Sequence, residues 1–368
     1  MEHEVETAVV ILNWNGKSFL ERFLPRLIEC TPGPDTEIVV ADNHSSDGSA
    51  EFMRRRYPGI RLIVNPENGG FAKGYNDALK QIKARFFVLL NSDIEVTPRW
   101  VEPVIAKMKK DPTVAAAQPK LRSYGCRGQF EYSGAAGGYI DRLGYPFCRG
   151  RIFDKVETDR GQYDSDTEIF WATGAALFVR ADLYLEHGGL DEDFFAHMEE
   201  IDFCWRMKNL GYKIMYYPES VVYHIGGGTL PKGSSRKTYL NFRNNMALLY
   251  KNLPDKALKP VMQKRKWMDL LAALMFLAKG HTGDFKAVIK ARKDFKEWKK
   301  RLQPERGKAP HPEKLSCMYG KSIVSAHYLH GISRFDQLSP HDFTPDAAAM
   351  QQGRPPVILP ARPSEPEA

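Results

Sequence analysis

The sequence predicts an α/β fold: a doubly wound, mostly parallel sheet flanked by helices, followed by a C-terminal helical extension. Two features of the chain carry this prediction. Between residues 8 and 118, short apolar runs alternate with segments of helical period, as in βαβ units with right-handed crossovers. From about Arg236 onward the pattern is helical, with Pro254 and Pro260 as breaks. A chain of 368 residues, 43% of them hydrophobic, can bury a core of this size.

Apolar runs mark the expected strands, at 8–12, 37–41, 61–64, 86–90 and 114–118. The run 86–90 is uninterrupted, as expected for a parallel strand buried on both faces, and it ends in Asn91, Ser92 and Asp93. Ligands bind at the carboxyl ends of strands in open α/β sheets, so Asp93 could hold Mg²⁺ or Mn²⁺ there. A turn before the next helix is the alternative interpretation.

Two other strand ends carry polar side chains. The first strand leads into Asn13-Trp14-Asn15-Gly16, and the second ends in Asp42 and a polar segment that runs to Gly48. The alternative is that Asp42 only stabilises a turn. The Gly-rich segment 65–74 lacks the spacing of known phosphate loops, so it gives no nucleotide signal of its own.

Three parts are expected along the chain. Residues 1–235 form the main domain, 236–303 a basic helical extension, and 304–368 a Pro-rich, partly disordered tail with one apolar island at 317–338. The tail beyond residue 339 is expected to be largely disordered. Within the main domain, the segment 119–168 has little period and is interpreted as a functional insertion whose short strands cover the edge of the sheet. Two strands are expected at 213–217 and 221–224.

The net charge of +8 is concentrated in residues 255–303, which contain 14 Lys/Arg and 5 Asp/Glu. A basic helical segment with an apolar face predicts contact with an anionic membrane or an acidic partner, and an ordinary helix packed on the main domain is the alternative. No apolar run approaches the ~20 residues that span a bilayer. Few aromatic residues interleave with the basic ones and no recognition motif is present, so nucleic acid is not expected as a partner.

Five cysteines without paired spacing argue for a reducing compartment and against a disulfide framework or a structural zinc. Glu2, Glu4 and Glu6 stand where a signal peptide would carry basic residues. We therefore expect a cytoplasmic protein, with peripheral contact at the inner face of the plasma membrane if residues 255–303 bind lipid.

The residue types at the strand ends suit transfer of a sugar from a nucleotide diphosphate. Such an enzyme recognises a base, neutralises a diphosphate leaving group and deprotonates an acceptor hydroxyl. Asp42 can accept a hydrogen bond from N3–H of uracil or thymine. Asp93, with Asn91, can hold the cation that bridges the phosphates. His224, which precedes Gly226-Gly227-Gly228, could complete the metal shell or be a structural histidine.

An acidic cluster supplies the candidates for the general base. Glu199, Glu200 and Asp202 lie close together at the expected start of a helix, and any of them could accept the acceptor's proton. The same cluster could merely favour a helix N-terminus through the helix dipole. The order and position of all the acidic sites together favour the functional interpretation.

The ordered motifs resemble those of inverting glycosyltransferases of family 2, which have the GT-A fold, and most of all the rhamnosyltransferase-type members that build bacterial surface polysaccharides. The resemblance extends over roughly residues 7 to 250. It rests on the segments 9–16 (VVILNWNG), 42–49 (DNHSSDGS), 68–76 (NGGFAKGYN), 89–93 (LLNSD), 174–180, 188–195 (GGLDEDFF) and 199–206.

The resemblance implies that residues 1–235 are the nucleotide-sugar-binding and catalytic domain of a metal-dependent hexosyltransferase. It implies nucleotide-sugar contacts for Asn13, Asn15, Asp42, Asn68, Gly74, Asn76, Asn91 and Ser92, and metal contacts for Asp93 and His224. The family's Glu-Asp pair, whose aspartate is the usual base, aligns with Glu199-Glu200. Glutamate reaches one methylene further at similar basicity, so the order of preference for the base is Glu200, Asp202, Glu199. Asn91 replaces the first aspartate of the metal motif, which leaves Asp93 as the principal charged ligand.

The expected reaction is a single in-line displacement with inversion, because one base suffices and no second nucleophile is evident. The expected donor is a uridine or thymidine diphosphate sugar, with rhamnose as one candidate sugar. The expected acceptor is a glycan or lipid-linked molecule in cell-surface polysaccharide synthesis. Trp171, Thr173 and the insertion 119–168 are candidates for the acceptor side, although a packing role is the favoured interpretation of Trp171.

Two other functions are alternatives to this one. A catalytically silent nucleotide-sugar-binding subunit of a glycan assembly complex would agree with the departure at Glu199-Glu200. A nucleotidyltransferase would need a basic Gly-rich loop after the first strand, and the segment 13–17 is a poor version of one.

Overall fold

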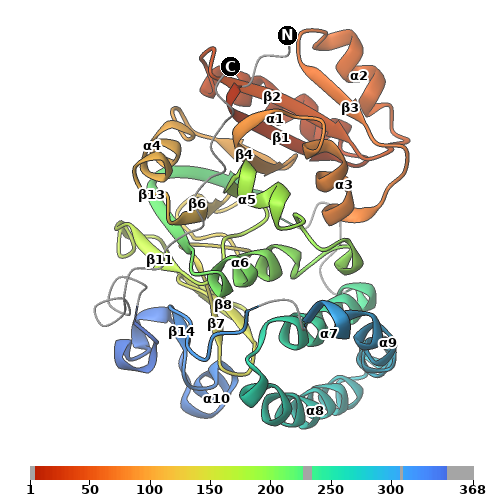
Figure 1. Cartoon of the computed structure of the whole chain (residues 1–368), viewed down its shortest axis with the longest axis vertical. Coiled ribbons are helices and arrows are strands. Elements are labelled where there is room, and N and C mark those ends of the chain that lie inside the picture. Colours follow the sequence, from red (N-terminus) through yellow and green to blue (C-terminus); the bar gives the residue numbers. More distant parts are fainter. Residues whose placement is uncertain (1–4, 227–233, 307–309, 346–368) are drawn as a thin grey trace, which may run out of the picture.

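The computed structural model describes residues 5–226, 234–306 and 310–345 (Figure 1). Its central sheet has the strand order β11-β13-β6-β12-β4-β1-β2-β3, and β5 also pairs with β13. These strands are β1 (Val5–Asn13), β2 (Thr36–Asp42), β3 (Arg61–Val64), β4 (Ala84–Asn91), β5 (Ile94–Val96), β6 (Val114–Ser123), β11 (Thr167–Ile169), β12 (Ala176–Arg180) and β13 (Lys213–His224).

The predicted mostly parallel sheet is confirmed. β1 is parallel to β2 and β4, β2 to β3, and β6 to β13, whereas β5, β11 and β12 run antiparallel to their neighbours. The antiparallel β12 lies between β4 and β6, so the fifth predicted strand does not pair directly with the fourth. The two strands expected at 213–217 and 221–224 are one strand, β13, with a register shift between Tyr217 and Val221.

The central strand β4 is buried on both faces, as its uninterrupted apolar run predicts. Because side chains alternate along a strand, Phe86 and Val88 pack with α1 and α4 on one face, whereas Phe87 and Leu89 pack with α3 and α6 on the other. The helices around the sheet are α1 (Lys17–Cys30), α2 (Ser49–Arg56), α3 (Gly70–Leu79), α4 (Glu102–Lys110), α5 (Ala181–Glu186) and α6 (Glu199–Asn209). A one-turn 3₁₀ helix, η1 (Glu192–Phe194), precedes α6.

The segment expected to be an insertion forms a second sheet together with β14 from the C-terminal tail, in the order β10-β9-β8-β7-β14. Its strands are β7 (Gly138–Asp141), β8 (Pro146–Cys148), β9 (Arg151–Ile152), β10 (Lys155–Val156) and β14 (Met318–Tyr319). Beyond β14 follow α10 (Ile323–His330), η2 (Phe335–Gln337) and η3 (Pro340–Asp342). Phe343 pairs with Tyr319, so order extends past the boundary expected at residue 339. The disorder expected for residues 346–368 concerns positions outside the described residues.

Three C-terminal helices pack together at the end of the molecule opposite β2 and β3 (Figure 1). They are α7 (Ser235–Asn252), α8 (Asp255–Ala278) and α9 (Thr282–Arg306). The Ser234 hydroxyl caps α7 by accepting a hydrogen bond from the Lys237 amide. Pro254 separates α7 from α8 as expected, but Pro260 lies inside α8 and does not break it. Of the helices described, none is long and apolar enough to cross a membrane.

Candidate active site

The register of the parallel strands brings three polar strand ends to one edge of the sheet. Asn13 pairs with Asp42 between β1 and β2, and Leu12 pairs with Asn91 between β1 and β4. The Asp42 carboxylate is 1% exposed and accepts hydrogen bonds from Asn13 Nδ2 at 3.1 Å and the Ser45 amide at 2.9 Å. The strand ends predicted from the sequence therefore do converge.

A cavity of about 450 Å³ opens beside this edge. Its walls come from the ends of β1 and β4, the segment before β12, the start of α6 and the start of α7. The sequence-predicted residues among its lining are Asn68, Asn91, Ser92, Asp93, Thr173, Glu199, Glu200 and His224. Residues more than 130 positions apart in the sequence therefore line the same cavity.

Asp93 and His224 form a buried pair at this cavity. The Nε2 atom of His224, at the end of β13, lies 3.1 Å from Asp93 Oδ1, and its Nδ1 atom lies 3.3 Å from Glu131 Oε1. Burial lowers the pKa of His224, but the Glu131 and Asp93 carboxylates outweigh it and raise that pKa to about 10. Burial raises the pKa of Asp93, and the hydrogen bond from His224 outweighs this, so the pKa of Asp93 is lowered.

These two side chains fit a divalent cation by chemistry. A carboxylate oxygen and an imidazole nitrogen stand side by side at a cavity wall, and both are accepted ligands of Mn²⁺. Among the described residues no cluster of three or more His, Cys, Asp or Glu could enclose a metal ion. A cation at this position would therefore take its other ligands from a bound diphosphate or from water.

Glu199 and Glu200 begin α6 at the same cavity. Each has an Oε2 atom that is buried without a hydrogen-bond partner. Burial, with the neighbouring Glu200 charge, raises the pKa of Glu199 well above its usual value. Burial also raises the pKa of Glu200, against the effect of nearby backbone amides, to about 7. The pair therefore offers a carboxyl group that changes charge near neutral pH.

Asp202, the second sequence candidate for the base, is not among the lining residues. Its oxygens are occupied by Lys251 Nζ at 2.8 Å, Arg206 Nε at 2.9 Å and Asn252 Nδ2 at 2.8 Å. Burial raises the pKa of Asp202, but the cations of Lys251 and Arg206 outweigh it, so the pKa is lowered. This buried ion network argues against Asp202 as the base, because a proton acceptor needs access to the substrate.

The backbone just before Glu199 is strained. Phe195, His197 and Met198 have φ angles of 66°, 70° and 76°, in the left-handed region that side chains disfavour. Asn244 of α7 holds this segment, because its Nδ2 atom donates to the carbonyl oxygens of Phe194 at 3.0 Å, Ala196 at 2.9 Å and His197 at 2.7 Å. The C-terminal helices therefore help to set the position of the glutamate pair.

Gly70, the first residue of α3, allows α3 to come close to the backbone of Phe195. Its φ is +86°, and a Cβ atom there would lie 2.5 Å from the carbonyl oxygen of Phe195. That oxygen instead accepts a hydrogen bond from the Phe71 amide at 2.8 Å. A side chain at position 70 would push the two cavity walls apart.

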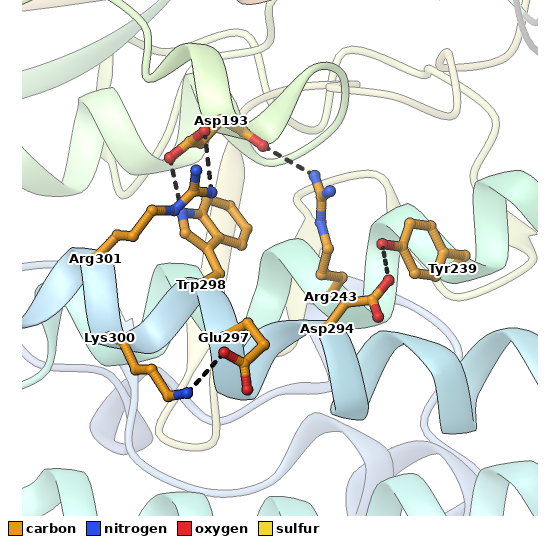
Figure 2. A pocket seen from close by; sticks show the side chains of 8 residues that line it. All are labelled: Asp193, Tyr239, Arg243, Asp294, Glu297, Trp298, Lys300 and Arg301. Atoms are coloured by element: carbon orange, nitrogen blue, oxygen red, sulfur yellow. Dashed lines mark hydrogen bonds and ion pairs between the residues drawn. The ribbon is translucent and has the colours of Figure 1, made fainter.

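A second pocket, of about 600 Å³, lies between α7, α9 and Asp193 of η1 (Figure 2). Trp298 Nε1 donates to Asp193 Oδ2 at 3.0 Å, and Arg243 donates to the Asp193 carbonyl oxygen at 3.0 Å. Arg301 lies 3.4 Å from the same carboxylate. These contacts tie η1 to α7 and α9.

Several sequence candidates lie outside the cavity lining. Trp171 is buried and its Nε1 donates to the Tyr139 carbonyl oxygen at 2.8 Å, so packing explains it. Asn76 Nδ2 donates to the Leu190 carbonyl oxygen at 2.7 Å. A Cβ atom at Gly74 would lie 2.9 Å from Asn43, which is a structural reason for that glycine. The candidates outside the lining are Asn13, Asn15, Asp42, Gly74, Asn76, Trp171 and Asp202.

Several residues that line the cavity were not predicted from the sequence. Arg236 and Lys237, at the start of α7, bring positive charge to the cavity, and His197 and Trp14 add ring surfaces. Trp14 lies between Asn13 and Asn15, both of which were predicted, so it could have been predicted from the same loop. Nothing in the local sequence links α7 to the sheet edge, because that contact is tertiary.

Comparison with solved structures identifies the class. The structure matches GalNAc-T7, solved with UDP, GalNAc and Mn²⁺, with a TM-score of 0.54 at 18% identity. The match covers 85% of this chain and 59% of that one, so the chain spans well under two thirds of its neighbour. The mixed sheet flanked by helices has the GT-A glycosyltransferase fold.

Sequence comparison then shows which family the chain resembles. Residues 8–178 match the family described as glycosyl transferase family 2. The chain is 26% identical to N-acetylglucosaminyl-diphospho-decaprenol L-rhamnosyltransferase of Mycobacterium tuberculosis, over 59% of this chain and 75% of the relative. It is 28% identical to rhamnosyltransferase WbbL of Escherichia coli, over 54% of this chain and 76% of the relative. The family match covers somewhat under half of the 368 residues, and the chain is similar to rhamnosyltransferase-like members of glycosyltransferase family 2.

These comparisons confirm the expected resemblance to rhamnosyltransferase-type members of family 2 and the expected GT-A fold. They also support the expectation of a glycosyltransferase in cell-surface polysaccharide synthesis, and they do not favour a catalytically silent subunit.

Proposed function

We propose that this protein is an inverting glycosyltransferase that moves a sugar from a uridine or thymidine diphosphate sugar to a glycan or lipid-linked acceptor. One observation carries the proposal: the Asp93–His224 pair and the Glu199–Glu200 pair line the same cavity. A cation site for a diphosphate and a titratable carboxyl for an acceptor hydroxyl are the two groups that such a transfer requires.

Glu200 is the proposed general base. It lines the cavity, has an unpartnered carboxylate oxygen and has a pKa of about 7, so a large share of it is ionised at neutral pH. Its carboxylate would take the proton of the acceptor hydroxyl as that oxygen attacks the anomeric carbon. Burial and the neighbouring Glu200 charge raise the pKa of the buried Glu199 well above its usual value, which disfavours a second negative charge in the site.

Asp93 and His224 are the proposed ligands of Mg²⁺ or Mn²⁺. When bound, the cation would neutralise the charge that develops on the diphosphate leaving group. Arg236 and Lys237 at the start of α7 supply further positive charge at the same cavity. Asn68, Asn91 and Ser92 are proposed to bind the donor, and Thr173 is proposed to lie on the acceptor side.

Asp42 is the proposed reader of the nucleotide base. It is buried at the strand edge with Asn13, and the orphaned Oδ1 atom of Asn13 is a further acceptor there. A carboxylate accepts a hydrogen bond from uracil or thymine N3–H, which cytosine lacks. This supports a uridine or thymidine nucleotide.

Relatives suggest the sugar and the acceptor. The mycobacterial relative is named as an L-rhamnosyltransferase that acts on a decaprenol-linked diphosphate sugar, and the Escherichia coli relative is also a rhamnosyltransferase. We therefore propose rhamnose as the first sugar to test and a polyprenyl-diphosphate sugar as the first acceptor.

The test is to incubate the purified protein with Mn²⁺, a panel of uridine and thymidine diphosphate sugars and a lipid-linked acceptor, and to measure released nucleotide and product. Transfer with inverted anomeric configuration is expected. Failure to bind or turn over every donor in the panel would refute the proposal. Loss of turnover in Glu200→Gln, with donor binding retained, separates an enzyme from a binding protein.

A further inference from the structure

Helix α8 carries an exposed apolar stripe. Trp267, Leu271 and Leu274 are 62%, 59% and 50% exposed, and Leu270 and Met275 beside them are also exposed. Positions 267, 270, 271 and 274 follow the i, i+3, i+4, i+7 spacing of one helical face. Single exposed apolar residues need no explanation, but a contiguous row on one face marks a contact surface.

The buried side of α8 carries charges instead. Arg265 and Asp269 are almost fully buried and pair with each other across one turn. Arg265 also donates to the Leu143 carbonyl oxygen at 2.9 Å, and Arg292 of α9 donates to Asp269 at 2.9 Å. Because breaking a buried ion network is costly, these bonds fix the rotation of α8 about its axis. The apolar stripe therefore cannot turn inward.

Basic side chains surround the stripe. Among the described side chains of α8, α9 and the turn between them, twelve Lys or Arg residues are exposed, and Asp255 and Glu297 are the exposed acidic residues. On α8 and its C-terminal end the exposed basic residues are Lys256, Lys259, Lys264, Lys266 and Lys279. A second copy of the chain would bring the same positive charge against itself, so the charge favours an anionic partner.

We propose that α8 docks on the surface of a membrane that contains anionic phospholipid, with Trp267, Leu271 and Leu274 entering the boundary between headgroups and acyl chains. Exposed large apolar residues with lysines around them, on a helix too polar to span a bilayer, are the pattern of an interfacial helix. α8 lies at one end of the molecule, away from β2 and β3 (Figure 1). The proposal goes beyond the proposed function, because docking requires no sugar transfer.

The test is co-sedimentation of the full chain with vesicles of phosphatidylcholine, with and without phosphatidylglycerol. The wild type is expected to bind the anionic vesicles, to bind neutral vesicles much less, and to dissociate as salt rises. The pair of substitutions Leu271→Glu and Leu274→Glu is expected to weaken binding by roughly tenfold or more. Lys264→Glu with Lys266→Glu should weaken binding to anionic vesicles alone.

Leu329→Glu is the matched control. Leu329 is 76% exposed on α10, so it tests the same change of chemistry at another place, and binding should be unchanged. Thermal unfolding of every variant shows whether it is folded. If the double variant does not fold, the single change Leu271→Ser takes its place.

Three outcomes would overturn the proposal. The wild type fails to sediment with anionic vesicles, or the Leu271/Leu274 variant sediments as well as the wild type, or the wild type is a dimer in solution that Leu271→Glu dissociates. The last outcome would assign the stripe to a second copy. Sugar transfer to a water-soluble acceptor is independent of all three, so failure of docking is distinguishable from failure of the proposed function.

Discussion

Asn244 Nδ2 donates a hydrogen bond to the His197 carbonyl oxygen at 2.7 Å, two residues before Glu199. One amide group of α7 thus holds the strained backbone that leads into the glutamate pair. The first helix of the helical extension therefore contacts the segment that leads into the cavity.

Replacing Asn244 by alanine is expected to lower kcat by roughly 10- to 100-fold, since the released segment would misplace Glu200. The KM for the donor should change little, because Asn244 does not line the cavity. Steady-state kinetics of Asn244→Ala measure this, with Gln263→Ala, exposed on α8, as the control. An unchanged kcat with a lower melting temperature would mean that Asn244 serves stability alone.

The rate of transfer should rise with pH through neutrality. Glu200 has a pKa raised to about 7, and only its ionised form can accept a proton. The pH profile of kcat/KM should therefore show an acid limb near pH 7. Glu200→Gln should lower kcat by about 10²- to 10⁴-fold. Glu186→Gln, exposed on α5, is the control, and a limb that survives in Glu200→Gln would assign the base elsewhere.

The same substitution should increase stability at high pH. The folded state holds the Glu200 proton more tightly than the unfolded chain, so this group contributes stability at low pH. That stability is lost as pH rises from about 4.5 to about 7. Glu200→Gln should gain about 1–3 kcal/mol of unfolding free energy at pH 8 and little at pH 4. Urea unfolding at both pH values measures this, and equal gains at both would contradict it.

Asp202→Asn should behave in the opposite way. It would leave the cations of Lys251 and Arg206 facing a neutral side chain in a buried site. Removing one partner of such a network costs about 3–5 kcal/mol. We expect a marked fall in the melting temperature, and a residual rate that keeps the acid limb near pH 7. A stable variant that has lost this limb would restore Asp202 as a candidate base.

Asp93→Asn should remove the effect of metal on donor binding. A donor at 100 times its Kd stabilises the folded protein by ~2.7 kcal/mol, which a thermal-shift assay detects. With Mn²⁺ present, this shift is expected in the wild type and not in Asp93→Asn. Glu95→Gln is the control, because Glu95 pairs with Arg127 outside the cavity. Equal shifts with and without Mn²⁺ in the wild type would contradict a metal role.

Metal binding should also strengthen as pH rises. A proton and a cation compete for the Nε2 lone pair of His224, whose pKa is raised to about 10. Titration of Mn²⁺ at pH 6.5 and pH 8.5 measures this dependence. Equal affinity at both values would mean that His224 does not bind the cation.

Much of the sheet and its ligand edge could be predicted from local patterns. The uninterrupted run 86–90 indicated a strand buried on both faces, and the polar residues after it indicated the edge where ligands bind. Strand period and strand-end chemistry are encoded within about ten neighbouring residues, so Asp42, Asn91 and Asp93 could be selected without coordinates.

Only the tertiary structure decided which of the residues predicted from the sequence line the same cavity. Asp202 and Glu200 are two residues apart on one helix, yet Asp202 enters an ion network with Lys251 and Glu200 lines the cavity. Local sequence could not separate them, because the difference comes from α7, which packs on α6 from fifty residues away. The raised pKa of Glu200 also depends on the tertiary structure, because burial causes it. Burial depends on the whole set of packed neighbours, whereas the position of a carboxylate at the end of a strand depends on the strand itself.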